Sequence, residues 1–302
     1  TTVIPGFGAE GFRATRADGQ GRFAFSSVPP GQYTLLARAG VPPRPTGRAA
    51  AGAPATRQQP PLWAQADVSV DGQDLAGIAL TMQMGMTISG RVRFYGSSPS
   101  PELTRLRVSL TAVQTQNEAT LTVSPAPVDA DGRFRLTGVA PGRYRLTSAV
   151  PGQKPDEGWV LRSAVVNGND TLDHPLELGA NQQVTDAVLT FTDRPSEVSG
   201  LVQNAAGEPI SDYFIIAFAS DPASWVPQSR RIASTRPSAD GRYLIRNLPP
   251  GDYRIAAVFD VEPGEWYDPS FLQQLVPTSL GVSLAEGEKK TQHLRLGVDR
   301  EP

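Results

Sequence analysis

The sequence predicts an all-β protein made of three tandem antiparallel β-sandwiches of the Greek-key kind. Two observations lead to this fold class. One strand-turn-strand phrase occurs three times at nearly equal intervals, and the segments between turns alternate apolar and polar residues with a period of two. The 302 residues include 29 Gly and 28 Pro, which predicts short strands separated by frequent turns.

The repeated phrase joins an Asp-Gly segment followed by Arg and an aromatic residue to a Pro-Gly-x-Tyr segment. Its copies lie at residues 18–33, 131–144 and 240–253. The Asp-Gly pair predicts a hairpin turn with glycine at positive φ, and the Pro-Gly pair predicts the next turn. Counted between the arginines, the period is 111 residues from Arg22 to Arg133 and 109 residues from Arg133 to Arg242. Repeats of this length indicate whole domains in tandem.

The domain boundaries are expected where one closing strand runs into the next opening strand, which gives domains at residues 1–84, 85–193 and 194–302. The second and third domains open with a Ser-Gly-x-Val segment at Gly90 and Gly200. No counterpart precedes the first copy of the phrase, so the first domain is expected to be incomplete at its N-terminus. The linkers are short, which predicts restricted angles between domains.

Two segments depart from the strand pattern. Residues 41–62 form a loop rich in proline that lacks a core-forming pattern. The segment from Asp268 to Leu275 is the one helix expected, because Asp268 is a capping residue and Pro269 suits the first turn.

The Gly-x-Val opening, the Asp-Gly-Arg-Phe turn, the Pro-Pro-Gly-x-Tyr turn and the closing strand after Glu288 resemble the bacterial carboxypeptidase regulatory-like domain. That family has a transthyretin-like, Ig-like β-sandwich fold. The resemblance covers the second and third domains in full and most of the first. It implies an exported bacterial protein in which the modules act as spacers, docking surfaces or accessory domains.

Composition excludes several classes of function. Basic and acidic residues are nearly balanced, at 28 and 30, without a basic stripe, so nucleic acid is not an expected partner. The chain has no cysteine, which excludes disulfides, thiolate zinc sites and cysteine nucleophiles. No apolar run is long enough to predict a transmembrane segment within this chain.

No motif in the sequence indicates an enzyme. His174, Glu177 and His293 resemble the ligand spacing of zinc carboxypeptidases, but the two histidines fall in different domains and the α/β catalytic fold is missing. A Gly-x-Ser-x-Gly elbow is also missing. We therefore expect neither catalytic residues nor a cofactor.

A calcium site is a weak alternative at Asp129 and Asp131, which begin a segment like an acidic calcium loop. Arg133 and Ala140 occupy two positions where an EF-hand needs further acidic ligands. The favoured interpretation is a hairpin turn in which the aspartate bonds to its own backbone.

The candidate interaction residues are aromatic residues and arginines in loops. A tryptophan recurs in the loop after the Pro-Gly-x-Tyr strand of each domain, either as a lid on the core or as an exposed platform for a sugar, a peptide or a protein. The residues singled out are Trp63, Trp159, Trp225, Arg230, Arg231, Trp266 and Tyr267.

The sequence thus predicts a non-enzymatic structural or interaction scaffold of the bacterial cell envelope, either periplasmic or extracellular. Its expected partners are other proteins, with docking on a membrane protein complex as an accessory periplasmic subunit. The alternative is a carbohydrate-binding or adhesion module of a surface protein, whose partner is a glycan.

Overall fold

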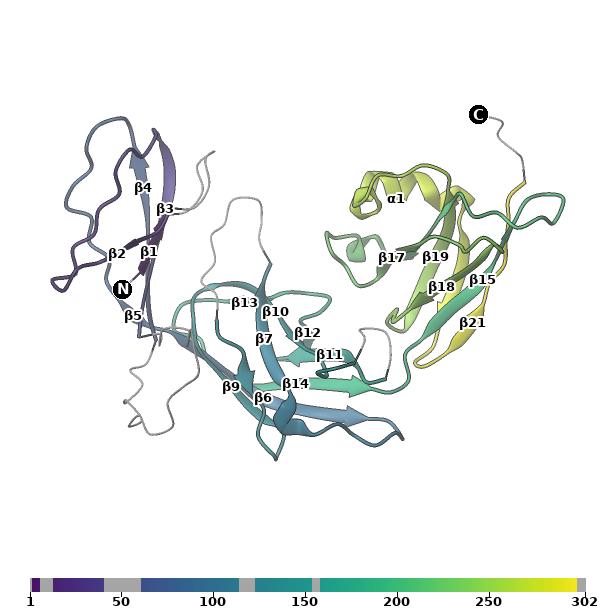
Figure 1. Ribbon diagram of the computed structural model, residues 1–302, viewed down its shortest axis with the longest axis horizontal. Coiled ribbons are helices and arrows are strands. Elements are labelled where there is room, and N and C mark those ends of the chain that lie inside the picture. Colours follow the sequence, from purple (N-terminus) through teal and green to yellow (C-terminus); the bar gives the residue numbers. More distant parts are fainter. Residues whose placement is uncertain (1, 6–12, 41–60, 114–122, 154–157, 298–302) are drawn as a thin grey trace.

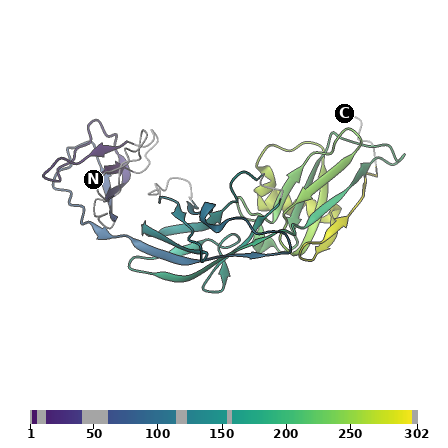
Figure 2. The same cartoon turned by 60° about the horizontal axis from the view of Figure 1, so that its bottom comes forward.

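The computed structural model describes residues 2–5, 13–40, 61–113, 123–153 and 158–297, and the elements in these ranges are almost all strands. The predicted all-β sandwich fold is confirmed. We call residues 1–84, 85–193 and 194–302 the first, second and third units. Figures 1 and 2 show that the units follow one another along the longest axis, with the second unit below the other two in Figure 1.

The second unit is a sandwich of two sheets. The larger sheet has the strand order β12-β11-β14-β6-β9, and the smaller one has the order β13-β10-β7-β8. The strands of the larger sheet are β6 (Met86–Tyr95), β9 (Arg133–Val139), β11 (Val160–Val166), β12 (Asn169–Asp170) and β14 (Val184–Thr192). The strands of the smaller sheet are β7 (Arg107–Ala112), β8 (Ala126–Pro127), β10 (Gly142–Ser148) and β13 (Leu176–Leu178). A short 3-10 helix, η1 (Leu103–Arg105), precedes β7.

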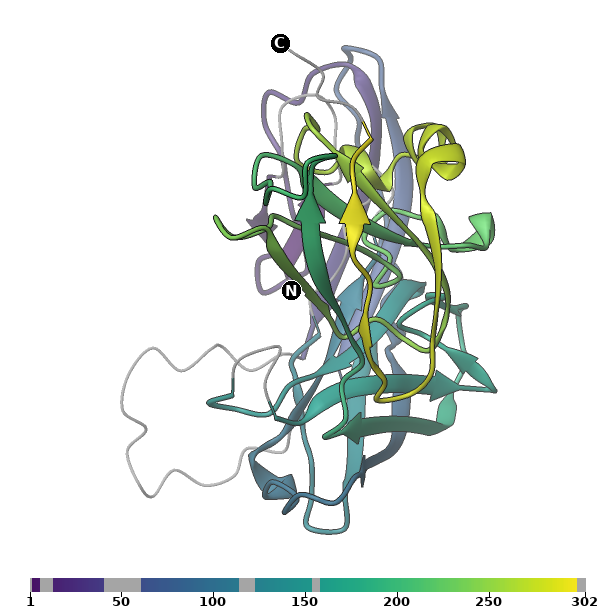
Figure 3. The same ribbon diagram turned by 90° about the vertical axis from the view of Figure 1, so that its right-hand side faces the viewer.

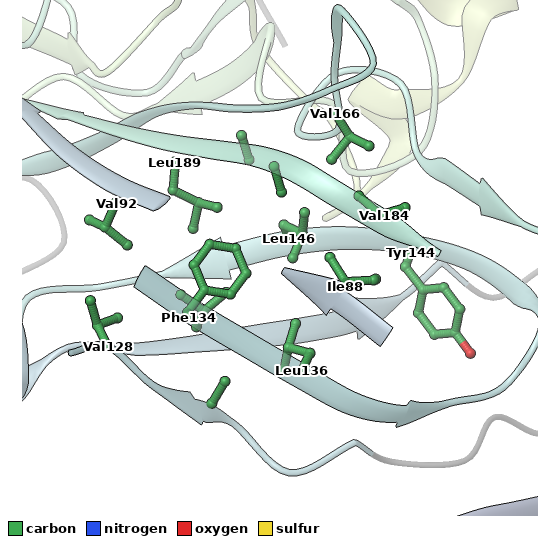
Figure 4. Close-up of a cluster of buried hydrophobic side chains, with 14 of the residues drawn as sticks. Ile88, Val92, Val128, Phe134, Leu136, Tyr144, Leu146, Val166, Val184 and Leu189 are labelled. Carbon is green, nitrogen blue, oxygen red and sulfur yellow. The ribbon is translucent and has the colours of Figure 1, made fainter. Parts of the chain in front are cut away.

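The two sheets of the second unit enclose one hydrophobic core. Strand β9 shows how the sequence pattern builds it, because Phe134 and Leu136 are buried while the arginines beside them are exposed. Figure 4 shows these side chains together with Ile88, Leu146 and Leu189 from strands of both sheets. The period-two alternation in the sequence therefore gives each strand one face that points into the core and one face that points to the solvent.

The third unit repeats this arrangement. One sheet has the order β18-β15-β21, with β22 also pairing with β15, and the other has the order β17-β16-β19-β20. The strands of the first sheet are β15 (Glu197–Gln203), β18 (Arg242–Arg246), β21 (Lys289–Thr291) and β22 (Leu294–Arg295). The strands of the second sheet are β16 (Phe214–Ala219), β17 (Ile232–Thr235), β19 (Gly251–Val258) and β20 (Leu280–Leu284).

A second core covers the outer face of the β17-β16-β19-β20 sheet. Leu272 of the helix α1 (Pro269–Leu275) packs there with Phe218 and Trp225. Strand β16 consequently has apolar residues on both faces and is buried along nearly its whole length. Figures 1 and 3 show the yellow-green helix beside this sheet. Three 3-10 helices complete the unit: η2 (Pro222–Ser224), η3 (Glu265–Tyr267) and η4 (Val276–Thr278).

The predicted helix is confirmed, with the predicted cap. The side chain of Asp268 accepts a hydrogen bond from the backbone N–H of Ser270 at 2.7 Å, and Pro269 occupies the first turn. None of the helices in the described ranges has the length and hydropathy to cross a bilayer.

The first unit contributes one sheet in the described residues, with the order β2-β1-β3-β4-β5. Its strands are β1 (Thr2–Pro5), β2 (Thr15–Arg16), β3 (Gly31–Ala39), β4 (Leu62–Val70) and β5 (Gln83–Met84). The predicted proline-rich loop at residues 41–62 lies almost entirely outside the described residues, which resume at Pro61.

The same hairpin turn occurs in all three units, two residues away from the position expected in the first. The glycine at positive φ is Gly21 in the first unit, not Gly19, and it matches Gly132 and Gly241. The residue three positions earlier closes the turn through backbone bonds, for example from Gly132 N to Asp129 O at 3.0 Å and from Asp129 N to Arg133 O at 2.9 Å. A three-residue loop with glycine at its last position explains this geometry.

A tyrosine hydrogen bond also repeats. The hydroxyl of Tyr144 donates to the backbone oxygen of Ala140 at 3.0 Å, and Tyr253 donates to Pro249 at 2.6 Å. Tyr33 makes the corresponding bond in the first unit. Burial raises the pKa of Tyr144 to about 12. Burial likewise raises the pKa of Tyr253 to about 12, so the phenols of Tyr144 and Tyr253 remain neutral donors that fix the turn before their strands.

Candidate functional site: the junction between the second and third units

The most strongly charged cluster among the described residues lies where the second unit meets the third. The second unit supplies Asp170, the last residue of β12, and Asp173, on the turn that connects β12 to β13. The third unit supplies Arg230 and Arg231, directly before β17. Because the two units face each other with opposite charges, this junction is the candidate functional site.

Arg230 makes the central contacts of the junction. Its Nε donates to Asp173 Oδ1 at 2.7 Å, and one terminal nitrogen donates to Asp173 Oδ2 at 2.9 Å and to Asp170 Oδ2 at 2.8 Å. The other terminal nitrogen donates to the backbone oxygen of Arg162. A planar guanidinium that meets one carboxylate with two bonds fixes direction as well as distance.

Two further contacts widen the junction. Arg231 donates to Asp173 Oδ2 at 3.1 Å, and it also donates to the backbone oxygen of Pro250 within its own unit at 3.2 Å. Arg162 of the second unit forms an ion pair with Glu286 of the third at 2.8 Å. The contacts therefore come from several segments of both units, and a rotation about any one of them breaks the others.

Partial burial strengthens these ion pairs. The side chains of Arg230 and Asp173 are 24% and 13% exposed. Burial opposes ionisation of Asp173, but hydrogen bonds and charge from Arg230 and Arg231 outweigh it and hold its pKa below the ordinary value. Burial likewise opposes the charge on Arg230, while Asp173 and Asp170 raise the pKa of its guanidinium above the ordinary value.

Local structure holds the charged side chains in place before they pair. The Oδ1 atom of Asp170 accepts hydrogen bonds from the backbone N–H groups of Ala164 and Leu172, which leaves Oδ2 for Arg230. On the other side, Trp225 anchors the loop that leads to Arg230, because its indole N–H donates to the backbone oxygen of Ala219 at 2.7 Å.

A polar groove of about 540 Å³ lies along the junction. Asp173 and His174 line it from the second unit, and Asp221, Arg231 and Asp252 are among the residues that line it from the third. Its chemistry suits groups that form hydrogen bonds or carry charge. The main chemical role of the arrangement is to join two folded units through ion pairs.

The junction between the first and second units is apolar instead. Trp63 is buried with Leu36 of its own unit and Ala140 of the second unit. Pro61 lies so close to Gly138 that a Cβ at Gly138 would be 2.3 Å from the proline ring. The backbone N–H of Gly85 also donates to the backbone oxygen of Pro61 at 3.0 Å. Neighbouring units are thus in direct contact at both junctions, through apolar packing at the first and through ion pairs at the second.

Most of the aromatic residues singled out lie in cores, an arrangement that corresponds to the lid and not to the exposed platform. Trp63, Trp159 and Trp225 are only 8%, 6% and 5% exposed. The ring of Trp159 packs against Phe94, with centroids 4.9 Å apart, and its N–H donates to the backbone oxygen of Pro99. A large ring that buries its face and bonds its one donor offers no surface to a partner.

Trp266 and Tyr267 are half-buried in the second core of the third unit. Trp266 packs on Phe214 with centroids 6.1 Å apart, and the guanidinium of Arg236 lies 4.1 Å from the centroid of the same phenylalanine. These aromatic residues therefore pack into the core that covers the α1 side of the sheet.

The remaining candidates lie elsewhere. Asp129 Oδ1 accepts the backbone N–H groups of Asp131 and Arg133 at 3.0 and 2.7 Å, as expected for a hairpin turn that bonds to its own backbone. His174 is in the second unit, and His293 is in the third, where its Nδ1 accepts the N–H of Leu201. In the described ranges, no three His, Cys, Asp or Glu side chains gather as metal ligands.

Sequence reasoning singled out Arg230 and Arg231 but missed their partners. Asp170 and Asp173 lie outside the repeated phrase. The short spacing Asp-x-x-Asp was the signal that the sequence offered. It does not show which arginine the carboxylates meet.

Comparisons with known proteins add no family. No family model and no curated protein matches the chain. Among solved structures, the Bacillus anthracis TIE protein is 12% identical with a TM-score of 0.24, and the match covers 98% of this chain and 47% of that chain. The chain therefore spans about half the length of that protein.

Two pilins are similar to a comparable degree. A streptococcal ancillary pilin is 14% identical with a TM-score of 0.26, over 89% of this chain and 76% of that chain. The major pilin subunit BcpA of Bacillus cereus is 11% identical with a TM-score of 0.28, over 98% of this chain and 93% of that chain. All three TM-scores are below 0.5, and we base no inference on them.

Proposed function

We propose that the chain is a non-enzymatic scaffold of the bacterial cell envelope that holds its parts at fixed angles. In this proposal residues 1–84, 85–193 and 194–302 are separate domains of the carboxypeptidase regulatory-like kind, placed in the periplasm or outside the cell. The observation that carries the proposal is the contact network of Arg230 with Asp170 and Asp173 across the second junction.

The linker at this junction supports a stiff connection. Only residues 193–196 separate β14 from β15. Asp193 is bound to the second unit, where it accepts the backbone N–H groups of Ser97 and Ser98. Ser196 is bound to the third unit through the backbone oxygen of Ala285. With both ends of a four-residue linker fixed, and with ion pairs beside it, the angle between the units has little freedom.

The partners in this proposal are other proteins. Stiff units set a distance between binding surfaces, and docking on a membrane protein complex is the specific role that we favour. Ion pairs and hydrogen bonds at a junction reduce the number of orientations that a partner must select, which lowers the entropic cost of binding.

The proposed stiffness can be tested by small-angle X-ray scattering on the full chain. We expect one conformation with the inter-unit angles of the structure to reproduce the scattering curve, at both low and high protein concentration. A curve that requires an ensemble with widely different angles would contradict the scaffold.

The proposed location and partners need a separate experiment. The intact protein, isolated from its own cells after chemical cross-linking, should be found in the envelope fraction with stoichiometric protein partners identified by mass spectrometry. Recovery from the cytoplasmic fraction alone would contradict the location.

A role in carbohydrate binding or adhesion remains the alternative. Because Trp63, Trp159 and Trp225 are buried, Trp266 and Tyr267, which are half-buried, are the singled-out aromatic residues that could form a sugar platform. Such binding would shift the tryptophan fluorescence during titration with a glycan, and substitution of Trp266 would abolish the shift.

A further inference from the structure

Arg145, on β10, lines a groove between the second and third units. Its Nε atom is buried and has no hydrogen-bond partner in the described ranges. Buried polar atoms of folded proteins are nearly always hydrogen-bonded, so each unpaired one needs a specific explanation. A binding site for a negatively charged ligand would explain this one.

Strand β10 directs Arg143 and Arg145 away from the core of the second unit. Tyr144 and Leu146, which alternate with them, are 1% and 0% exposed, so the two arginines share the outer face of the smaller sheet. Arg143 lies opposite Glu177 of β13 and forms an ion pair with it at 3.7 Å. Because these two side chains are 45% and 80% exposed, the pair is weak, and Arg143 can also meet another anion.

The carboxylate with the strongest influence on Arg145 is already engaged. Asp173 attracts the charge of Arg145, but it accepts hydrogen bonds from Arg230 and Arg231. Burial outweighs the attraction and lowers the pKa of the Arg145 guanidinium below its ordinary value, and the charges of Arg143 and Arg230 act in the same direction. A further negative group beside Arg145 would therefore be stabilised.

The equivalent arginine of the third unit has a partner. Arg254 follows Tyr253 as Arg145 follows Tyr144. One terminal nitrogen of Arg254 donates to the backbone oxygen of Val276, on η4, at 3.4 Å. The third unit thus covers this arginine with a segment of its own, whereas Arg145 faces the groove between the units.

The groove beside Arg145 is formed by both units, and we call it the arginine groove. It has a volume of about 520 Å³, which is within the range of small-ligand sites. It continues into the polar groove of the junction, because Asp173, His174 and Arg231 line both. Besides its charged side chains it has apolar walls, which are formed by Val113, Pro175, Ala223, Val226 and Pro227.

We propose that the arginine groove binds the carboxylate of an organic acid, with the carboxylate on Arg145 and Arg143 and an apolar stem against Val226. A planar guanidinium can meet a carboxylate with two parallel hydrogen bonds. The same chemistry occurs in a free organic acid and in an acidic side chain of a polypeptide, and the test separates these sources. The inference rests on the docked arrangement of the two units, which is part of the proposed function.

The charges and the walls of the arginine groove favour a stem with a single negative charge. Asp173 and Glu177 also line the groove and would repel a phosphate dianion more strongly than a monocarboxylate. Each methylene of the stem that is buried against the apolar walls increases the affinity. Hexanoate should therefore bind more tightly than acetate or inorganic phosphate.

Nuclear magnetic resonance of the two histidines can detect this binding in the full chain. His174 lines the arginine groove, whereas His293 bonds to Leu201 within the third unit. Titration with sodium hexanoate, at constant pH and ionic strength, should shift the imidazole resonances of His174 to saturation and leave those of His293 unchanged. Acetate and inorganic phosphate should require at least tenfold higher concentrations for the same shift.

A pair of variants controls for the place of binding. Arg145→Gln should weaken the binding of hexanoate at least tenfold. Arg135→Gln makes the same change at an exposed arginine of β9, in the other sheet of the same unit, and should leave the binding unchanged. Both variants should unfold at the temperature of the original chain, because neither arginine belongs to the core.

A blocked peptide with one glutamate between two valines distinguishes the sources of the carboxylate. Tighter binding of this peptide than of hexanoate would indicate an acidic segment of a polypeptide, and equal or weaker binding would indicate a free acid. The inference is overturned if hexanoate gives no saturable shift of His174, if phosphate binds as tightly, or if Arg145→Gln leaves the binding intact. Such a result, together with scattering that fits one conformation, would leave the proposed function standing.

Discussion

Replacement of Arg230 by alanine should release the third unit from the second. The change removes the bonds to both oxygens of Asp173, to Asp170 and to the backbone oxygen of Arg162. Arg231 remains as a partner of Asp173, so the carboxylate keeps one of its charged contacts. Both units should still fold, because Arg230 belongs to neither hydrophobic core.

The size of the effect follows from the contacts. A hydrogen bond to a charged group contributes about 1.5 to 3 kcal/mol when it is shielded from water. Water can compensate for part of this loss, because the Arg230 side chain is 24% exposed. We therefore expect the docked arrangement to lose about 2 kcal/mol, which corresponds to a roughly 30-fold shift toward undocked orientations.

Pulsed electron spin resonance can measure this shift as a distribution of distances between two spin labels. The chain has no cysteine, so cysteines introduced at exposed Thr185 of the second unit and Gln273 of the third give two unique attachment points. The unmodified junction should give a narrow distribution, and Arg230→Ala should broaden it. Arg242→Ala is the matched control, because Arg242 is 76% exposed and its ion pair is with Asp240 of its own unit. A narrow distribution that survives Arg230→Ala would refute the reasoning.

Three further changes test other parts of the structure. In the folded protein the pKa of Asp173 lies below its unfolded value of 3.8, so its contribution to the stability of the junction is complete above pH 3.8 and is lost as the pH falls through the lower folded value. The distribution of label distances should therefore broaden only below about pH 3.8. Broadening near neutral pH would contradict this assignment. Gly132→Ala places a side chain at φ 78° and a Cβ 2.8 Å from the backbone oxygen of Val92. Denaturant titration should therefore show that the free energy of unfolding falls by about 1 to 2 kcal/mol. Gly281→Ala is the control, because a Cβ at Gly281 would lie in open space and should change the stability little. Leu272→Ala should reduce the free energy of unfolding by about 2 to 5 kcal/mol in the same assay, and a loss well below 1 kcal/mol would mean that α1 does not depend on its packing against the sheet.

The repeated phrase predicted most of the fold because it encodes local geometry. Alternation placed the buried residues of β9 and β10 correctly, and a capping aspartate with a following proline located α1. The predicted position of the positive-φ glycine in the hairpin of the first unit was wrong by two residues, because Asp18-Gly19 resembles the other Asp-Gly pairs in sequence. The turn requires glycine as the last residue of a three-residue loop, and only Gly21 has that position.

The candidate site was less predictable, because its contacts join segments that lie far apart in the sequence. Arg230 and Asp173 are 57 residues apart, and no local pattern pairs them. Trp225 is buried because α1 packs over the outer face of the β17-β16-β19-β20 sheet. The continuous apolar run of β16, from Phe214 to Ala219, was a signal for burial on both faces that the alternation argument did not use.

The parallel pairing of β6 with β14 has a mechanical consequence for the second unit. The chain enters β6 at Met86 and leaves β14 at Thr192, and the two strands pair side by side from Ile88 and Val184 to Tyr95 and Thr192. Tension along the polypeptide would pull these strands in opposite directions along their lengths, so the hydrogen bonds between them would bear the load together in shear. Strands loaded in this way resist separation better than strands peeled apart one bond at a time, and the unfolding rate under tension would be correspondingly low.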